Sequence, residues 1–575
     1  MNFSDSQVFN PPHGVRIQPG HAHRLTARNL LIFFFLISLL FTAASTHAAD
    51  TIAIFPSQIS LDGKEARQRL LVQRVNKQKQ VLEQITNGIT FSTSDPLVVK
   101  IDNGFAIPVS NGTATISAKV GAHSTKVKVV VSRMNEEHEW SFVNHIQPVL
   151  VKTGCSTGPC HGAQAGQAGF TLSLRGYDNE ADYISLTRHA LGRRINLDEP
   201  AKSMLLTKPT GAVPHKGGKR FEVDSIDYKV LADWIASGAP GPKTAERALE
   251  KIEVLPEHVV LKPGDNQQLI VRAHFDDGHI EDVTHWSIFT AANGTVTQVE
   301  EDGRITVIGA GEGVISAWYL QKIALTTVTV PFTNRISSST FSKAPKRNFI
   351  DELVNAKLKE LNLPPSPRSG DSEFIRRAYL DTIGVLPTVA ETKAFLADKS
   401  PKKRDALIEA LLRRPEFVDY WSYKWSDLLL VNSAPKMLRQ PAMWAYYNWI
   451  RQNVANNTPW DEFVRQILLA QGSTLENGAG NFYVLHDEPR LLAENVSQAF
   501  LGMSINCAKC HNHPMEKWTN DEYYQFANLF SRVRMKNGSN DGDKIIFAAM
   551  EGDLVQPRTG KPQVPRPLDG TPVAI

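Results

Sequence analysis

The chain has 575 residues, a formal net charge of +4 and four cysteines. A chain of this length is too long for one hydrophobic core, so we expect several domains. Acidic and basic residues are nearly balanced and spread along the chain, without the basic stripe that follows phosphates, so we expect no nucleic-acid partner.

The N-terminal segment has the pattern of a secretion signal. Arg24 and Arg28 precede an apolar run from Leu30 to Ala44, and the small residues that follow end at Ala49. The run has about 15 residues, fewer than the ~20 that a membrane-spanning helix needs. We therefore predict a signal peptide at residues 1–49, with an uncleaved anchor as the alternative. The rest of the chain is expected to be periplasmic, associated with the cell envelope or secreted.

Two segments, residues 50–133 and 250–333, have the pattern of small antiparallel β-sandwiches. Both consist of short β-branched runs that are separated by turn sequences. The predicted strands include Thr113 to Ala118, Lys126 to Val131, Val314 to Tyr319 and Leu325 to Val330.

Asp282-Val283-Thr284, Trp286 and the glycine-rich residues 309–313 carry a resemblance in the second of these segments. They resemble the bacterial immunoglobulin-like domains of group 2. The first segment is a weaker match and lacks the Asp-Val-Thr sequence. Domains of this kind usually act as spacers or adhesive modules, so the resemblance implies no chemistry in either segment.

Two other segments are predicted to be helical. In residues 135–242, an amphipathic run from Glu136 to Val151 leads into a cysteine pair, and a second helix from Tyr228 to Ser237 follows a long loop. This order is the plan of a small cytochrome c. Residues 346–535 indicate a larger helical domain, and residues 536–575 a Gly/Pro-rich tail that we expect to be truncated.

The predicted fold class is therefore multidomain. It comprises two all-β immunoglobulin-like sandwiches, one small α-helical cytochrome c-like domain and one larger, mostly α-helical domain.

The four cysteines form two pairs, and a histidine directly follows each pair. Covalent haem attachment requires two thiols that add to the vinyl groups of one porphyrin, and an imidazole next in sequence that reaches the iron. Cys507, Cys510 and His511 have the standard spacing for haem c. The alternatives are a disulfide, a redox-active pair, or a zinc site that includes His513. Three adjacent chelators would crowd one zinc ion, and a redox pair is expected in a βαβ context.

The other pair has a wider spacing. Four residues separate Cys155 from Cys160, and His161 follows. Gly158 and Pro159 can fold the extra residues into a turn, so that both sulfurs face one haem edge. The spacing alone leaves haem and a disulfide open.

A haem iron that is held by one histidine has a sixth position, whose ligand decides between electron transfer and binding of a small molecule. For the first motif we predict His215, because a loop with two glycines can approach a porphyrin closely, with Met204 as the alternative. For the second motif, Met535 and Met515 are candidates, and an open iron is a third alternative.

A family resemblance covers both motifs. The segment from Phe142 through the first motif to Trp234 resembles the planctomycete-type cytochrome c domain, which tolerates the wider spacing. The segment from Ile350 through Arg376 to Asp381, the second motif, Trp518 and Phe530 is similar to the partner domain of that family. The resemblance implies two covalent c-type haems, and a further domain of unknown function usually follows in that family.

We therefore expect an exported protein with two haem c groups that exchanges electrons with redox partner proteins at the cell envelope. Two alternatives remain. The chain is an accessory subunit of an envelope redox enzyme, or it is a secreted interaction protein in which the cysteine pairs are disulfides.

Overall fold

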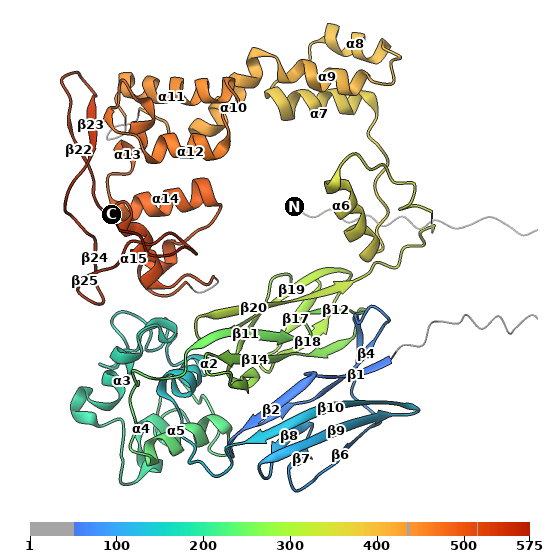
Figure 1. Cartoon of the computed structure of the whole chain (residues 1–575), viewed down its shortest axis with the longest axis vertical. Helices are drawn as coiled ribbons and strands as arrows, with labels where there is room; N and C mark the ends of the chain where they lie inside the picture. The colour runs from blue at the N-terminus through green and yellow to red at the C-terminus, as the bar shows by residue number, and fades with distance from the viewer. Residues whose placement is uncertain (1–50, 338, 434–437, 514–515, 575) are drawn as a thin grey trace, which may run out of the picture. The chain divides into compact units, whose positions relative to one another are not determined.

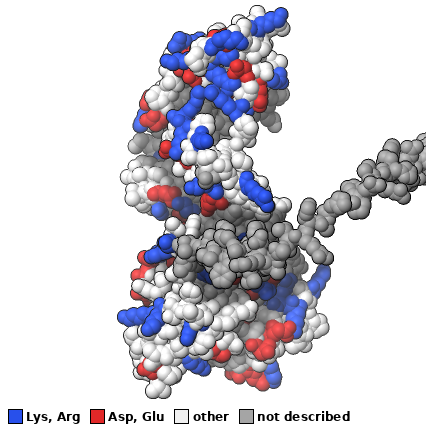
Figure 2. Space-filling model, turned by 90° about the vertical axis from the view of Figure 1, so that its right-hand side faces the viewer, with Lys and Arg blue, Asp and Glu red and all other residues white. Residues whose placement is uncertain are grey.

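The computed structural model describes residues 51–575 apart from residues 338, 434–437, 514–515 and 575. The predicted signal peptide lies outside the described residues. Sandwich-like β-sheets occur in the N-terminal part, and a larger helical region lies toward the C-terminus (Figure 1). Within the described part, no helix is long and apolar enough to cross a membrane. Acidic and basic side chains are interspersed on the face in Figure 2.

The first β region has two small sheets around one apolar core. The four-stranded sheet has the order β2-β10-β9-β6, and the three-stranded sheet has the order β3-β8-β7. In β10, every second residue, Val127, Val129 and Val131, is buried, as expected for a strand with one face on the core. The strands of the two sheets are β2 (Gln58–Asp62), β3 (Gln68–Arg69), β6 (Ile89–Thr93), β7 (Val99–Asp102), β8 (Phe105–Pro108), β9 (Gly112–Val120) and β10 (His123–Ser132).

The second β region is joined to the first by strand pairing. One seven-stranded sheet has the order β1-β4-β5-β12-β20-β19-β16, and β5 pairs in parallel with β12 at Val81 and Val259. Two three-stranded sheets, β11-β14-β15 and β13-β18-β17, complete the region. These strands are β1 (Thr51–Phe55), β4 (Leu71–Val75), β5 (Val81–Ile85), β11 (Leu249–Leu255), β12 (His258–Val260), β13 (Asn266–Gln268), β14 (Ile270–Phe275), β15 (Ile280–Asp282), β16 (Ile288–Ala291), β17 (Thr297–Val299), β18 (Arg304–Val307), β19 (Gly311–Tyr319) and β20 (Lys322–Val330).

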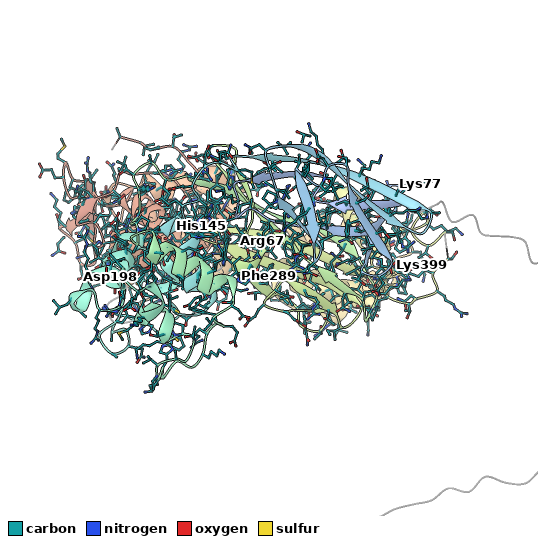
Figure 3. All side chains as sticks on the ribbon, turned by 90° about the horizontal axis from the view of Figure 1, so that it is seen from below. Arg67, Lys77, His145, Asp198, Phe289 and Lys399 are labelled. Atoms are coloured by element: carbon teal, nitrogen blue, oxygen red, sulfur yellow. The ribbon has the colours of Figure 1, made fainter. Side chains whose placement is uncertain are left out.

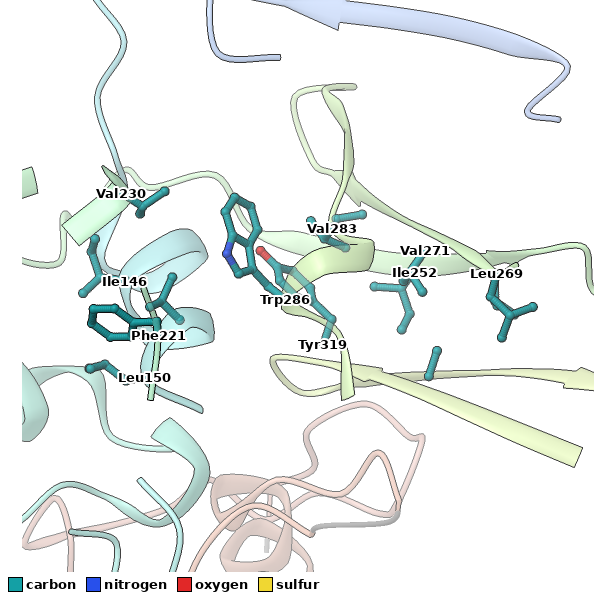
Figure 4. Packing of buried hydrophobic residues seen from close by; sticks show 14 of the residues in the cluster. Ile146, Leu150, Phe221, Val230, Ile252, Leu269, Val271, Val283, Trp286 and Tyr319 are labelled. Atoms are coloured by element: carbon teal, nitrogen blue, oxygen red, sulfur yellow. The ribbon is translucent and has the colours of Figure 1, made fainter. Parts of the chain in front are cut away.

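Short helices separate the two β regions in sequence. The helical turn η1 (Phe142–Ile146) leads into α2 (Gln147–Lys152), and α3 (Asn179–Thr187), α4 (Met204–Thr207) and α5 (Ile226–Ala236) follow. Their apolar side chains form one cluster with those of the second β region. In Figure 4 these include Ile146, Leu150, Phe221, Trp286 and Tyr319. The first cysteine motif directly follows α2, so this core holds the start of the motif.

The C-terminal region is mainly helical up to residue 528, with one short strand between α12 and α13, and further strands follow. Its helices are α6 (Phe349–Glu360), α7 (Asp371–Ile383), α8 (Val389–Ala397), α9 (Lys403–Leu412), α10 (Pro415–Leu428), α11 (Gln440–Ala455), α12 (Trp460–Leu468), α13 (Asn481–Leu485), α14 (Pro489–Leu501) and α15 (Asn520–Asn528). The region also has two small sheets. One has the order β21-β23-β22, and the other pairs β24 with β25. Their strands are β21 (Gly472–Ser473), β22 (Val533–Asn537), β23 (Lys544–Ala548), β24 (Val555–Gln556) and β25 (Lys561–Pro562). The segment that we predicted as an irregular tail therefore contains strands, and β22 runs through the predicted boundary at residue 535.

The helical segment with the first motif depends on Trp234. This side chain is fully buried, and its Nε1 donates to the Pro240 carbonyl at 2.9 Å. We expect Trp234→Ala to lower the free energy of unfolding by about 3–5 kcal/mol, because it leaves a large cavity. The exposed control, Val223→Ala, should change it by less than about 0.5 kcal/mol. Denaturant unfolding followed by far-ultraviolet circular dichroism measures both, and equal effects of the two substitutions would contradict the expectation.

Candidate functional site

A cavity of about 700 Å³ lies beside the first cysteine motif. Cys155, Cys160 and His161 line it. Met204 and His215, the two candidates for a sixth ligand, line the same cavity. The structure thus brings together all the side chains that the sequence assigned to the first site.

The residues between the two cysteines form a compact turn. The amide of Cys160 donates to the Thr157 carbonyl at 3.0 Å, and the amide of His161 donates to the Cys155 carbonyl at 2.9 Å. Gly162 permits this close return of the chain, because a Cβ there would lie 2.1 Å from the Ser156 carbonyl oxygen. Backbone hydrogen bonds therefore fold the four intervening residues into a turn, and both thiols line one cavity.

Cys155 and Cys160 differ in burial. Cys155 is 8% exposed, whereas Cys160 is half-buried. Burial raises the pKa of the Cys155 thiol, so this thiol is protonated at neutral pH. The guanidinium of Arg220 lies 3.3 Å from the Cys160 sulfur. All four cysteines of the chain are free thiols in this structure.

His161 is held in the orientation of a metal-binding imidazole. Its Nδ1 lies 3.0 Å from the Phe170 carbonyl, and its own carbonyl accepts from the Leu172 amide at 2.7 Å. A carbonyl can only accept, so Nδ1 carries the proton and Nε2 keeps its lone pair. Burial lowers the pKa of His161, which also favours the neutral form that binds metals.

His215 faces His161 in this cavity. The two ring centroids are 6.4 Å apart, and the ring planes differ by 8°. Nδ1 of His215 lies 2.9 Å from the Gly218 carbonyl, so this ring also keeps its lone pair on Nε2.

The cavity has a cationic lining. None of the described residues that line it is acidic, while its basic members are Arg193, Arg194, Lys208, Lys216 and Arg220. Arg194 has a structural role, because its guanidinium donates hydrogen bonds to the carbonyls of Ser185, His189 and Gly169. The other cations leave the cavity suited to a ligand with an apolar body and anionic groups. This lining was not predictable from the sequence, because the basic residues are scattered over a long loop without periodicity.

Asp182 ties the helix before the first motif to the loop after it. The carboxylate accepts from Gln147 Nε2 at 2.5 Å and from the Ser173 hydroxyl at 2.7 Å. Its pKa is raised from 3.8 to about 6 by burial, although these hydrogen bonds oppose the shift.

The second motif lies in an exposed turn. Cys507 and Cys510 are exposed, and the turn η7 (Asn506–Lys509) contains the first of them. The buried side chain of Asn520 donates to the carbonyls of Ala508 at 2.8 Å and Lys509 at 3.0 Å, which fixes the turn. His511 is oriented by a 2.6 Å contact between its Nδ1 and the Asn512 carbonyl.

Of the two candidates for a sixth ligand at the second motif, Met535 lies within the described residues. Met535 lies in β22 and packs against the core of the C-terminal region. Met515 lies outside the described residues. In the described part of the chain, no three His, Cys, Asp or Glu side chains are grouped as ligands of a metal ion.

A second cavity has a volume of about 660 Å³. Arg67 and His145, which are labelled in Figure 3, are among the residues that line it. It also contains a paired network, in which His145 Nε2 lies 3.3 Å from Glu281 and His279 Nδ1 lies 2.7 Å from Asp62. Burial alone would raise the pKa of Glu281, but the two histidines hold it below its ordinary value. These histidines therefore act in ion pairs between elements, and the first motif lies elsewhere.

Comparisons with known proteins support part of the predicted family. Residues 349–535 match the family described as PSCyt2, protein of unknown function (DUF1549). This confirms the resemblance of the helical region with the second motif. No curated protein matches the chain.

Among solved structures, the chain is similar to parts of surface-layer and adhesion proteins at low identity. Domains 5–6 of the S-layer protein SbsC are 13% identical, with 49% of this chain and 98% of that chain covered and a TM-score of 0.22. A longer SbsC structure is 10% identical, with 50% and 28% covered and a TM-score of 0.14. The bacterial integrin-binding protein invasin is 11% identical, with 51% and 63% covered and a TM-score of 0.11.

Asp182 predicts a pH dependence of stability. Because its pKa is raised in the folded state, the protonated form favours folding, and this contribution is lost as the pH rises from about 4 through about 6. We expect a loss on the order of 2–3 kcal/mol over this window relative to Asp182→Asn, which does not titrate. Denaturant unfolding at a series of pH values measures it.

The control for this titration is Asp198→Asn, at an exposed carboxylate of the same segment. This variant should keep the pH profile of the unaltered protein. Parallel profiles for the unaltered protein and Asp182→Asn would disprove the role of Asp182.

Proposed function

We propose that this chain is an exported c-type cytochrome-like protein that binds two haem groups covalently and transfers electrons at the cell envelope. The observation that carries the proposal is the cavity at the first motif, where Cys155, Cys160, His161 and His215 meet. The signal sequence pattern and the match of residues 349–535 to PSCyt2 agree with it.

The residues of the first cavity fit a haem. Its volume of about 700 Å³ is in the range of cofactor sites, which is roughly 300–1,000 Å³. Phe170, Leu150 and Leu205 supply apolar walls, and the cationic lining suits the two carboxylates of the porphyrin. Cys155 and Cys160 would hold the macrocycle by thioether bonds, and His161 would bind the iron through Nε2.

The second motif would hold its haem through Cys507, Cys510 and His511. When bound, a haem supplies a one-electron redox centre whose potential depends on the axial ligands and on its exposure. The protein's own residues orient the imidazoles through backbone carbonyls and limit the access of water at the first site. The redox partners are proteins whose identity the residues of the two sites do not specify.

The proposal predicts two covalent haems per chain. After co-expression with a haem-maturation system, the denatured protein should give a pyridine haemochrome spectrum of two haems, with the corresponding mass increase. We expect the Cys155→Ser/Cys160→Ser variant and the Cys507→Ser/Cys510→Ser variant each to retain one haem. The two variants serve as controls for each other.

A colourless mature protein would reject the proposal. If its mass were instead lower by two hydrogens per cysteine pair, the pairs would be disulfides, and the secreted interaction protein would be the correct alternative. Loss of a haem from the first motif alone would restrict the proposal to the second site.

A further inference from the structure

We propose that His215 is the second axial ligand of the iron at the first site. This centre is then closed by two histidines, and it exchanges electrons without binding a small external ligand. The inference rests on the proposed haem in this cavity. It also decides between His215 and Met204, which the sequence left open.

The first argument is the position of the two rings. His161 and His215 line the same cavity, their ring centroids are 6.4 Å apart and their planes differ by only 8°. A metal ion bound by two imidazole nitrogens at about 2 Å each would separate the ring centroids by roughly 6 Å. The observed centroid separation of 6.4 Å is close to this value.

The second argument is the protonation pattern. Nδ1 of His161 donates to the Phe170 carbonyl, and Nδ1 of His215 donates to the Gly218 carbonyl. Both rings therefore have their lone pair on Nε2, and both have the carbonyl partner that commonly fixes a metal-binding histidine.

The third argument is the construction of the loop around His215. The Gly218 amide donates to the His215 carbonyl at 2.9 Å, and Gly218 has a φ of +77°. Lys208 Nζ donates to the Pro214 carbonyl at 3.2 Å, and the Arg220 amide donates to the Pro209 carbonyl at 2.7 Å. These bonds hold the loop at the cavity.

Gly217 has a specific role in this loop. A Cβ at this position would lie 2.9 Å from Cε1 and 3.2 Å from Nε2 of His215. A methyl group would thus crowd the edge of the ring that carries the free nitrogen. Gly217 has no positive φ, so it is this contact, and not backbone strain, that opposes a larger residue here.

Met204 differs from His215 in its surroundings. It lines the cavity from the first turn of α4, and its place is fixed by that short helix. Its thioether cannot donate to a backbone carbonyl, so it lacks the kind of contact by which the Gly218 carbonyl orients His215. We therefore assign Met204 to the apolar wall.

The test uses the mature chain with Cys507→Ser/Cys510→Ser, so that only the first haem contributes to the spectra. Its absorption and electron paramagnetic resonance spectra should be those of a six-coordinate, low-spin iron, and the reduced form should not bind carbon monoxide. His215→Ala should give a high-spin iron that binds carbon monoxide, and added imidazole should restore the low-spin spectrum. Met204→Ala, the matched control from the same cavity, should leave the low-spin spectrum intact.

Gly217→Ala provides a milder change that keeps both candidate ligands. We expect it to convert part of the iron to the high-spin form. The inference is overturned if the parent chain binds carbon monoxide, if Met204→Ala opens the iron, or if His215→Ala leaves it low-spin. The pyridine haemochrome of each variant reports haem content separately. Absence of haem from this chain rejects the proposed function, whereas haem with an open iron rejects only the role of His215.

Discussion

In the first motif, the amide of His161 returns to the carbonyl of Cys155, and this one hydrogen bond sets the geometry of the site. It closes a turn over the four residues that separate the cysteines and directs both thiols and the imidazole toward one cavity. The helix α2 anchors the start of the turn through the core, and the bond from His161 Nδ1 to Phe170 anchors its end. Without this turn, the wider spacing would separate the two sulfurs.

The two cysteine motifs are embedded differently in the protein. The first motif lines a cavity, with a buried thiol and a facing histidine. The second occupies an exposed turn, to which the Asn520 side chain donates hydrogen bonds. The standard spacing of the second motif made it the stronger signal in the sequence. The structure provides the more complete surroundings for the first. The proposal of a haem therefore rests mainly on the cysteine spacing at the second motif and mainly on the surrounding residues at the first.

Features with short-range patterns were predictable from the sequence. The predicted strands Thr113 to Ala118 and Lys126 to Val131 correspond to the cores of β9 and β10, because alternation of buried residues is visible within a few positions. His215, which lines the cavity with His161, was predicted as a candidate because adjacent glycines indicate a loop that can approach a ligand closely. The cationic lining and the Phe170 carbonyl were not predictable, since they depend on how a long irregular loop folds. The strands β22 to β25 were missed because the Gly/Pro content of that segment indicated a tail.

The burial of Cys155 has a consequence for biogenesis. Its thiol is enclosed and protonated in the folded protein, and only a thiolate reacts readily. If a haem is joined to this sulfur as we propose, it would have to be attached while the segment is still open, before the core closes around α2. The exposed thiols of the second motif do not have to react before the chain folds. The proposed haem at the first motif would thus be attached before folding is complete, whereas the thiols of the second motif stay accessible after folding.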